Sequence, residues 1–81
     1  MTKFNGRLKQ LRAEKDVTQK EVATFLGITD RAYQYYEYGK RDPNILVVQK
    51  LADFFDVSID YLIGRVDIKS MVTSNIGDSA T

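Results

Sequence analysis

The sequence contains no cysteine and no histidine, and it has a single proline. The lack of cysteine excludes a disulfide framework and a thiolate metal site, while the lack of histidine removes the most common general base and metal ligand. The chain also lacks any run near the ~18 consecutive apolar residues that a membrane-spanning helix requires, and its first residues lack the apolar stretch of a signal peptide. We therefore expect a cytoplasmic protein that is not an enzyme and binds no metal, no cofactor and no membrane.

Positive and negative charges are distributed unevenly along the 81 residues. Residues 1–41 contain nine lysine and arginine side chains against five acidic ones, whereas residues 42–81 contain three against six. A chain of this length is expected to form one small domain. A basic half joined to an acidic half favours an oriented contact with a polyanion.

Helical periodicity and capping residues predict an all-α fold with five helices. Phe4, Leu8 and Leu11 recur at helical spacing, Thr18 and Glu21 form a capping box, and glycines end three of the helices. The expected helices comprise residues 2–15, 18–26, 30–38, 45–55 and 59–63. The expected buried faces include Val22, Phe25 and Leu26 in the second helix, and Ile45, Val48, Leu51, Ala52 and Phe55 in the fourth.

The second and third expected helices meet across a short turn that contains Gly27, which predicts a helix-turn-helix. On a helical projection Tyr33 and Tyr36 share one side of the third helix, a side suited to packing on its neighbours. The opposite side carries Arg31, Gln34, Tyr35 and Tyr38. A solvated surface is the simplest interpretation of that side, but two tyrosines there are more typical of a binding face. The second helix of a helix-turn-helix is also the one that enters the DNA major groove.

Three blocks of the sequence, covering roughly residues 4–65, resemble the lambda-repressor-like, or Xre/Cro, family. Residues 18–29 (TQKEVATFLGIT) are similar to its helix-turn-helix, residues 36–43 (YEYGKRDP) to the segment that follows, and residues 51–64 (LADFFDVSIDYLIG) to its fourth and fifth helices. The resemblance implies a five-helix bundle that binds double-stranded operator DNA, usually as a homodimer. It assigns residues 1–65 to the DNA-binding domain and leaves residues 66–81 as a polar C-terminal tail.

The resemblance also implies which side chains contact bases, namely Asp30, Arg31 and Tyr35, with Gln34 adjacent. Arg31 has the geometry to bond guanine O6 and N7 together; a phosphate contact or a free surface position is the alternative. Asp30 either accepts from cytosine N4 or only stabilises the first turn of its helix. Tyr35 either stacks on a thymine methyl group or bonds to a phosphate.

The resemblance also implies phosphate contacts near the ends of the second and third expected helices, by Thr18, Gln19, Thr29, Tyr38, Lys40 and Arg41. Gln19 stands at a helix N-terminus, where free amides and the helix dipole favour the same anion; its alternative role is only to begin the helix. Lys40 and Arg41 directly follow the third helix, which places their charges beside the expected DNA backbone.

Arg12 and Glu37 match positions that form an ion pair in some members of the family. If the pair is partly buried, breaking it would leave an uncompensated charge; at the surface it would contribute only ~0–1 kcal/mol. The candidate dimer surface consists of Tyr61, Leu62 and Ile63, with ordinary core packing as the alternative.

The predicted function is that of a transcriptional repressor, in which a homodimer occupies a palindromic operator with half-sites about 10 bp apart. Alternatively, the chain is an antitoxin or protein-interaction module whose tail binds a partner protein, or the N-terminal part of a longer repressor. Leu46 and Val47 stand where the family more often has polar residues, which predicts an exposed apolar patch or a contact with the tail. The apolar tail residues available for docking are Met71, Val72 and Ile76.

Overall fold

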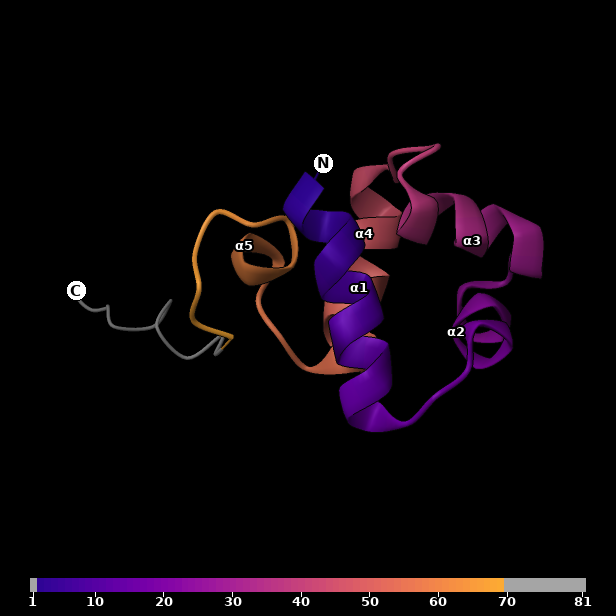
Figure 1. Cartoon of the computed structure of the whole chain (residues 1–81), viewed down its shortest axis with the longest axis horizontal. Helices are drawn as coiled ribbons and strands as arrows, with labels where there is room; N and C mark the ends of the chain where they lie inside the picture. The colour runs from indigo at the N-terminus through magenta and orange to yellow at the C-terminus, as the bar shows by residue number, and fades with distance from the viewer. Residues whose placement is uncertain (1, 70–81) are drawn as a thin grey trace.

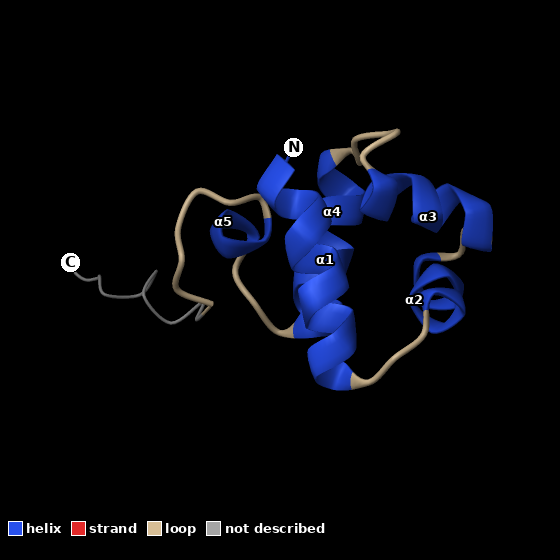
Figure 2. Ribbon diagram, in the orientation of Figure 1, coloured by secondary structure: helices blue, strands red, loops and turns tan. Residues whose placement is uncertain are grey.

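A computed structural model describes residues 2–69, and five helices account for most of them (Figures 1 and 2). The helices are α1 (Thr2–Lys15), α2 (Gln19–Leu26), α3 (Asp30–Tyr38), α4 (Ile45–Phe55) and α5 (Ile59–Leu62). Residues 2–69 contain no β-strand, and none of their helices combines the length and apolar character needed to cross a bilayer. The predicted all-α fold with five helices is confirmed, and the helix ends differ from the expected ones by at most one residue.

α1 runs through the middle of the molecule, and the other helices pack around it (Figure 1). α2 and α3 contact each other on one side of α1, and α5 lies on the opposite side. α4 contacts α1, α2 and α5, so it joins the two sides behind α1. This arrangement leaves the outer side of the α2–α3 pair free of the rest of the bundle.

The core consists of apolar side chains that the helices contribute at helical spacing. Phe4, Leu8 and Leu11 of α1 are buried, as predicted. The other buried apolar side chains are Val22, Ala23, Leu26, Tyr33, Tyr36, Val48, Leu51, Ala52, Phe55, Val57, Tyr61 and Leu62. Burying a large apolar side chain stabilises the fold by ~1.5–3 kcal/mol, so this cluster is what holds α3 in place against α1 and α2.

Local capping explains where the helices begin and end. A side-chain oxygen accepts a hydrogen bond from the amide three residues further on at four helix starts, namely Thr18, Thr29, Asn44 and Ser58. α2 and α3 end at Gly27 and Gly39, whose φ values of 73° and 78° lie in the left-handed region that glycine adopts readily. At Gly39 an added Cβ would also lie 2.7 Å from Asn5 Nδ2. The positive φ and the lack of room for a Cβ therefore both favour glycine there.

Two side chains that were predicted to be buried are exposed. Phe25 of α2 is 48% exposed, and its ring lies 4.8 Å from that of Phe54, centroid to centroid. Ile45, the first residue of α4, is exposed together with Leu46, whereas Val47 is half-buried. The apolar patch predicted at the start of α4 is therefore present, and it extends to Ile45.

Residues 66–69, which the sequence assigns to the tail, are joined to α1 by two ion pairs. An Arg7 guanidinium nitrogen lies 2.5 Å from the Asp67 carboxylate, and Lys69 Nζ lies 2.7 Å from the Glu14 carboxylate. The chain after α5 is therefore held to α1 at two points, and in Figure 1 it passes around the side of α5 that faces away from α1. The expected docking residues of the tail lie outside the described residues: Met71, Val72 and Ile76.

Candidate nucleic-acid interface

The turn between α2 and α3 is closed by local hydrogen bonds. After Gly27, the Ile28 amide donates to the Ala23 carbonyl at 3.0 Å, which completes the end of α2. The Thr29 hydroxyl then accepts from the Ala32 amide at 3.1 Å and begins α3. Because both helix ends are fixed within a few residues, α2 and α3 form one rigid helix-turn-helix unit.

α3 turns one side to the core and the other to solvent, as the helical projection predicts. Tyr33 and Tyr36 are buried, and their rings meet edge to face with centroids 6.5 Å apart. The outer side carries exposed Asp30, Arg31 and Tyr38 and half-buried Gln34 and Tyr35. A helix anchored by two buried rings therefore presents a row of hydrogen-bonding groups outwards.

The C-terminal end of α3 places two cations beside this row. The Lys40 and Arg41 amides both donate to the Tyr35 carbonyl, at 2.9 and 3.3 Å, so the chain turns tightly after Gly39. The Arg41 guanidinium carbon lies 5.8 Å from the centre of the Tyr35 ring, within range of a cation–π contact. Both basic side chains are exposed, which forms a positive rim next to the outer side of α3.

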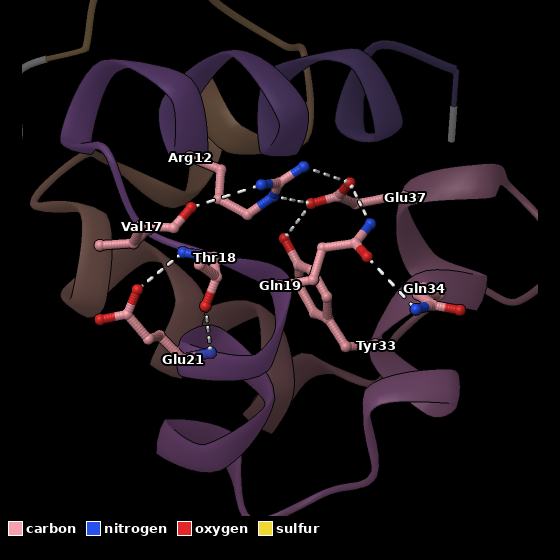
Figure 3. Close-up of polar contacts among 8 residues, drawn as sticks. All are labelled: Arg12, Val17, Thr18, Gln19, Glu21, Tyr33, Gln34 and Glu37. Atoms are coloured by element: carbon pink, nitrogen blue, oxygen red, sulfur yellow. Dashed lines mark hydrogen bonds and ion pairs between the residues drawn. The ribbon is translucent and has the colours of Figure 1, made fainter.

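Glu37 is the centre of a buried polar network beneath the α2–α3 unit (Figure 3). Its side chain is 1% exposed. Arg12 Nε donates to Glu37 Oε2 at 2.6 Å and Arg12 Nη2 to Oε1 at 3.2 Å, a two-bonded ion pair from α1 to α3. The Tyr33 hydroxyl donates to Oε2 at 2.6 Å. The ion pair suggested by the resemblance is thus present, and its carboxylate lies in the core.

The network shifts the ionisation of its members. Burial alone would raise the pKa of Glu37, but hydrogen bonds from Arg12, Tyr33 and Gln19 favour the anion and hold the pKa below its ordinary value. The bond to Glu37 raises the pKa of Arg12, and burial next to the carboxylate raises the pKa of the Tyr33 hydroxyl. The charged pair is therefore the stable form near neutral pH.

Gln19 belongs to the same network, a role that the sequence did not reveal. Its Nε2 donates to Glu37 Oε1 at 3.0 Å, and its Oε1 accepts from Gln34 Nε2 at 3.3 Å (Figure 3). Gln19 is half-buried. Tyr33 and Glu37 stand four residues apart on α3, a spacing at which side chains on one helix meet, whereas no local pattern places Gln19 against them.

The other residues expected to contact phosphate stand at the ends of the two helices. The Thr18 hydroxyl accepts from the Glu21 amide at 3.0 Å, while the Thr18 amide donates to the Glu21 carboxylate at 2.8 Å. Thr29 caps α3 in the same way. Each hydroxyl uses a lone pair for its cap and keeps its proton for a further acceptor. Their contact with phosphate stays a prediction.

The candidate dimer surface is mostly buried within the chain itself. Tyr61 and Leu62 are 5% and 0% exposed, because α5 packs them against α1 and α4. Ile63 is half-buried. Tyr61 and Leu62 therefore serve as core residues, as the alternative interpretation held, and only Ile63 retains surface for a partner.

These features define the class of the protein. A rigid pair of helices, with an exposed polar side on α3 and a basic rim beside it, is a helix-turn-helix domain of the kind that binds DNA. The helix-turn-helix family profile matches residues 8–62. The chain belongs to this family, and the predicted membership of the Xre, or lambda-repressor-like, group is confirmed.

Named relatives agree with this membership. The chain is 42% identical over 60 residues to the SPbeta prophage-derived uncharacterized HTH-type transcriptional regulator YonR of Bacillus subtilis, covering 74% of this chain and 56% of YonR. It is 38% identical over 60 residues to the cryptic phage CTXphi transcriptional repressor RstR of Vibrio cholerae, covering 74% of this chain and 54% of RstR.

A solved structure has the same fold. The crystal structure of a transcriptional regulator from Listeria innocua matches with a TM-score of 0.74 and 33% identity, over 78% of this chain and 59% of the regulator. The chain thus spans little more than half the length of each of these three proteins. What they share with it is the helix-turn-helix domain.

Proposed function

We propose that this chain binds double-stranded DNA sequence-specifically and regulates transcription in the cytoplasm. The observation that carries the proposal is the outer side of α3, where Arg31, Gln34 and Tyr35 project from a helix held by buried Tyr33 and Tyr36. A helix of this kind fits the major groove, where side chains reach the base edges.

Two sets of contacts would divide the work of binding. Lys40 and Arg41 at the end of α3, and Gln19 at the start of α2, lie where the DNA backbone passes a docked recognition helix. These contacts supply affinity that falls as salt rises, because each neutralised phosphate releases counterions. Arg31 and its neighbours on α3 supply selectivity through the base edges.

The full proposal is a homodimer on a palindromic operator, acting as a repressor. Two copies of α3 would enter successive major grooves with half-sites about 10 bp apart, and the bound dimer would occlude the polymerase. Support for repression comes from RstR, whose name describes a repressor. Support for a dimer comes from the family resemblance, which implies binding to operator DNA as a homodimer.

Selection of bound duplexes from a random pool tests the proposal directly. We expect enrichment of one palindromic motif, a logarithmic affinity that falls linearly with the logarithm of salt concentration, and two chains per duplex by sedimentation. Failure to enrich any motif, together with no binding to any duplex at low salt, would refute DNA binding. Enrichment of a single half-site bound by one chain would refute the dimer alone.

A further inference from the structure

The Gln19 amide links the buried Glu37 carboxylate to Gln34 on the outer side of α3 (Figure 3). Its nitrogen donates inwards to Glu37 Oε1 at 3.0 Å, and its oxygen accepts from Gln34 Nε2 at 3.3 Å. Three polar side chains from two helices therefore form a continuous chain of hydrogen bonds from the core to the surface expected to face DNA.

The charge on Glu37 fixes the direction of this chain. An ionised carboxylate can only accept hydrogen bonds, and both oxygens of Glu37 receive donors, from Arg12, Tyr33 and Gln19. A half-turn of the Gln19 amide would direct its oxygen at Glu37 Oε1, so two acceptors would face each other with no proton between them in a half-buried place. Gln19 must therefore keep its nitrogen inwards and its oxygen towards α3.

The same argument sets the orientation of Gln34. Because the Gln19 oxygen can only accept, Gln34 must turn its Nε2 towards it. This leaves the Gln34 oxygen and one remaining N–H for a ligand. An acceptor and a donor side by side complement the major-groove edge of adenine, which offers the N6 donor and the N7 acceptor.

We infer that Glu37, acting through Gln19, is a positioning residue that sets Gln34 to read adenine. The inference rests on the proposed function. It adds to that function the base that Gln34 contacts, adenine, and the two residues that orient Gln34, namely Glu37 and Gln19. Neither Glu37 nor Gln19 contacts the base. Their contribution is to hold the Gln34 amide in one of its two orientations before DNA arrives, which removes an ordering cost from binding.

Side-chain amide signals in the NMR spectrum of the free protein test the chain of bonds without DNA. We expect the Gln34 amide resonances to move in Gln19→Ala, and to move again in Glu37→Gln. Gln10→Ala is the matched control, since Gln10 also donates to a carboxylate, that of Glu14 at 3.0 Å on α1. An unchanged Gln34 signal in Gln19→Ala would overturn the inference whatever the protein binds.

Selection from a random duplex pool tests the base that is read. The wild-type protein should prefer an adenine at one position of each half-site by about tenfold, the value of a good bidentate contact. Gln34→Ala and Gln19→Ala should both lose that preference at the same position, while Gln10→Ala keeps it. Replacing that adenine by 7-deazaadenine, which lacks N7, should weaken the wild-type protein but not Gln34→Ala.

Gln19→Ala decides the outcome, because it removes the link between Glu37 and Gln34 and leaves both partners of the buried Arg12–Glu37 pair in the chain. If it weakens binding to all duplexes equally and keeps the adenine preference, Gln19 acts only on phosphate and the inference is wrong. If the wild-type protein enriches no motif at all, the proposed function fails instead, and the NMR experiment still decides whether Glu37 orients the two amides.

Discussion

At the scale of single residues, Arg31 and Lys40 should differ in what their loss does to DNA binding. Arg31→Ala should relax selectivity at one base pair by about 1–3 kcal/mol, because the exposed Arg31 lies on the outer side of α3. Lys40→Ala should weaken binding to all sequences alike and lower the salt slope by about 1. Titrations of matched and scrambled operators at several salt concentrations measure both effects.

Lys50→Ala controls for the general loss of one positive charge. Lys50 is exposed on α4, a different helix from the one whose end carries the basic rim. Its loss should leave the base preference intact and change the salt slope less than Lys40→Ala does. Equal behaviour of the Arg31 and Lys40 variants would show that bases and phosphates are not read by separate residues.

Glu37 should make stability depend on pH. Its pKa in the folded protein is below the ordinary value of 4.5, so the unfolded chain takes up a proton first as pH falls. The stabilisation is therefore complete above about pH 5 and is lost as pH falls through the folded-state pKa. At neutral pH Glu37→Gln should cost about 3 kcal/mol, since it leaves Arg12 without its anion in a partly buried place.

Urea unfolding of the wild-type protein and Glu37→Gln between about pH 7 and pH 3 measures this contribution. The difference in free energy of unfolding between them should shrink steadily towards the acid end. The pKa of Glu14 is also lowered, by hydrogen bonds from Lys69 and Gln10, but that effect is common to both proteins and cancels. A difference that is constant with pH would contradict the assigned ionisation.

The sequence predicted half of the Glu37 network. Arg12 and Glu37 were paired by resemblance, and Tyr33 was placed on the inner side of α3 by periodicity. The bond from the Tyr33 hydroxyl to Glu37 lies within α3, whereas the place of Gln19 beside Glu37 depends on how α2 and α3 pack. Contacts between side chains on different helices are set by tertiary packing, and a local sequence pattern does not specify them.

At the scale of helices, the capping box of α2 should contribute measurably to stability. Thr18→Ala removes the bond between the Thr18 hydroxyl and the Glu21 amide and should cost about 1 kcal/mol. Thr24→Ala is the control, because Thr24 is exposed within the same helix. Thermal unfolding followed by circular dichroism compares them, and equal losses would mean that the cap is energetically unimportant.

Helix boundaries were predicted well because their signals are local. A threonine, asparagine or serine before a helix and a glycine after it act through atoms only a few residues away. The burial of Phe25 and Ile45 was predicted wrongly, since a helical stripe says which residues share a side but not how far the neighbouring helices extend. Phe25 faces Phe54 at the rim of α2 and α4 rather than the core.

At the scale of the whole molecule, α1 connects the two ends of the bundle. On one side its Arg12 pairs with Glu37 beneath the α2–α3 unit. On the other its Arg7 bonds to the chain around and after α5. The same helix therefore supports the candidate DNA-binding side and holds residues 66–69, which follow α5.

Arg7 should be the residue that holds the segment after α5. Its guanidinium donates to the Tyr61 carbonyl, to the Val66 carbonyl at 2.6 Å and to Asp67, and it lies 4.0 Å from the centre of the Tyr61 ring. The Arg7 side chain is only 13% exposed. Arg7→Met keeps most of its length and removes these bonds, so it should cost about 2 kcal/mol.

Hydrogen exchange locates the effect of Arg7→Met. The Ser58 amide donates to the Lys69 carbonyl at 2.9 Å. This amide should exchange faster in the variant, because residues 66–69 are released from α1. Amides within α3 should exchange as before, apart from the general loss of stability. Arg65→Ala is the control, since Arg65 is exposed and lies 3.9 Å from Asp60. If both variants release Ser58 equally, or neither does, Arg7 is not what fastens this segment.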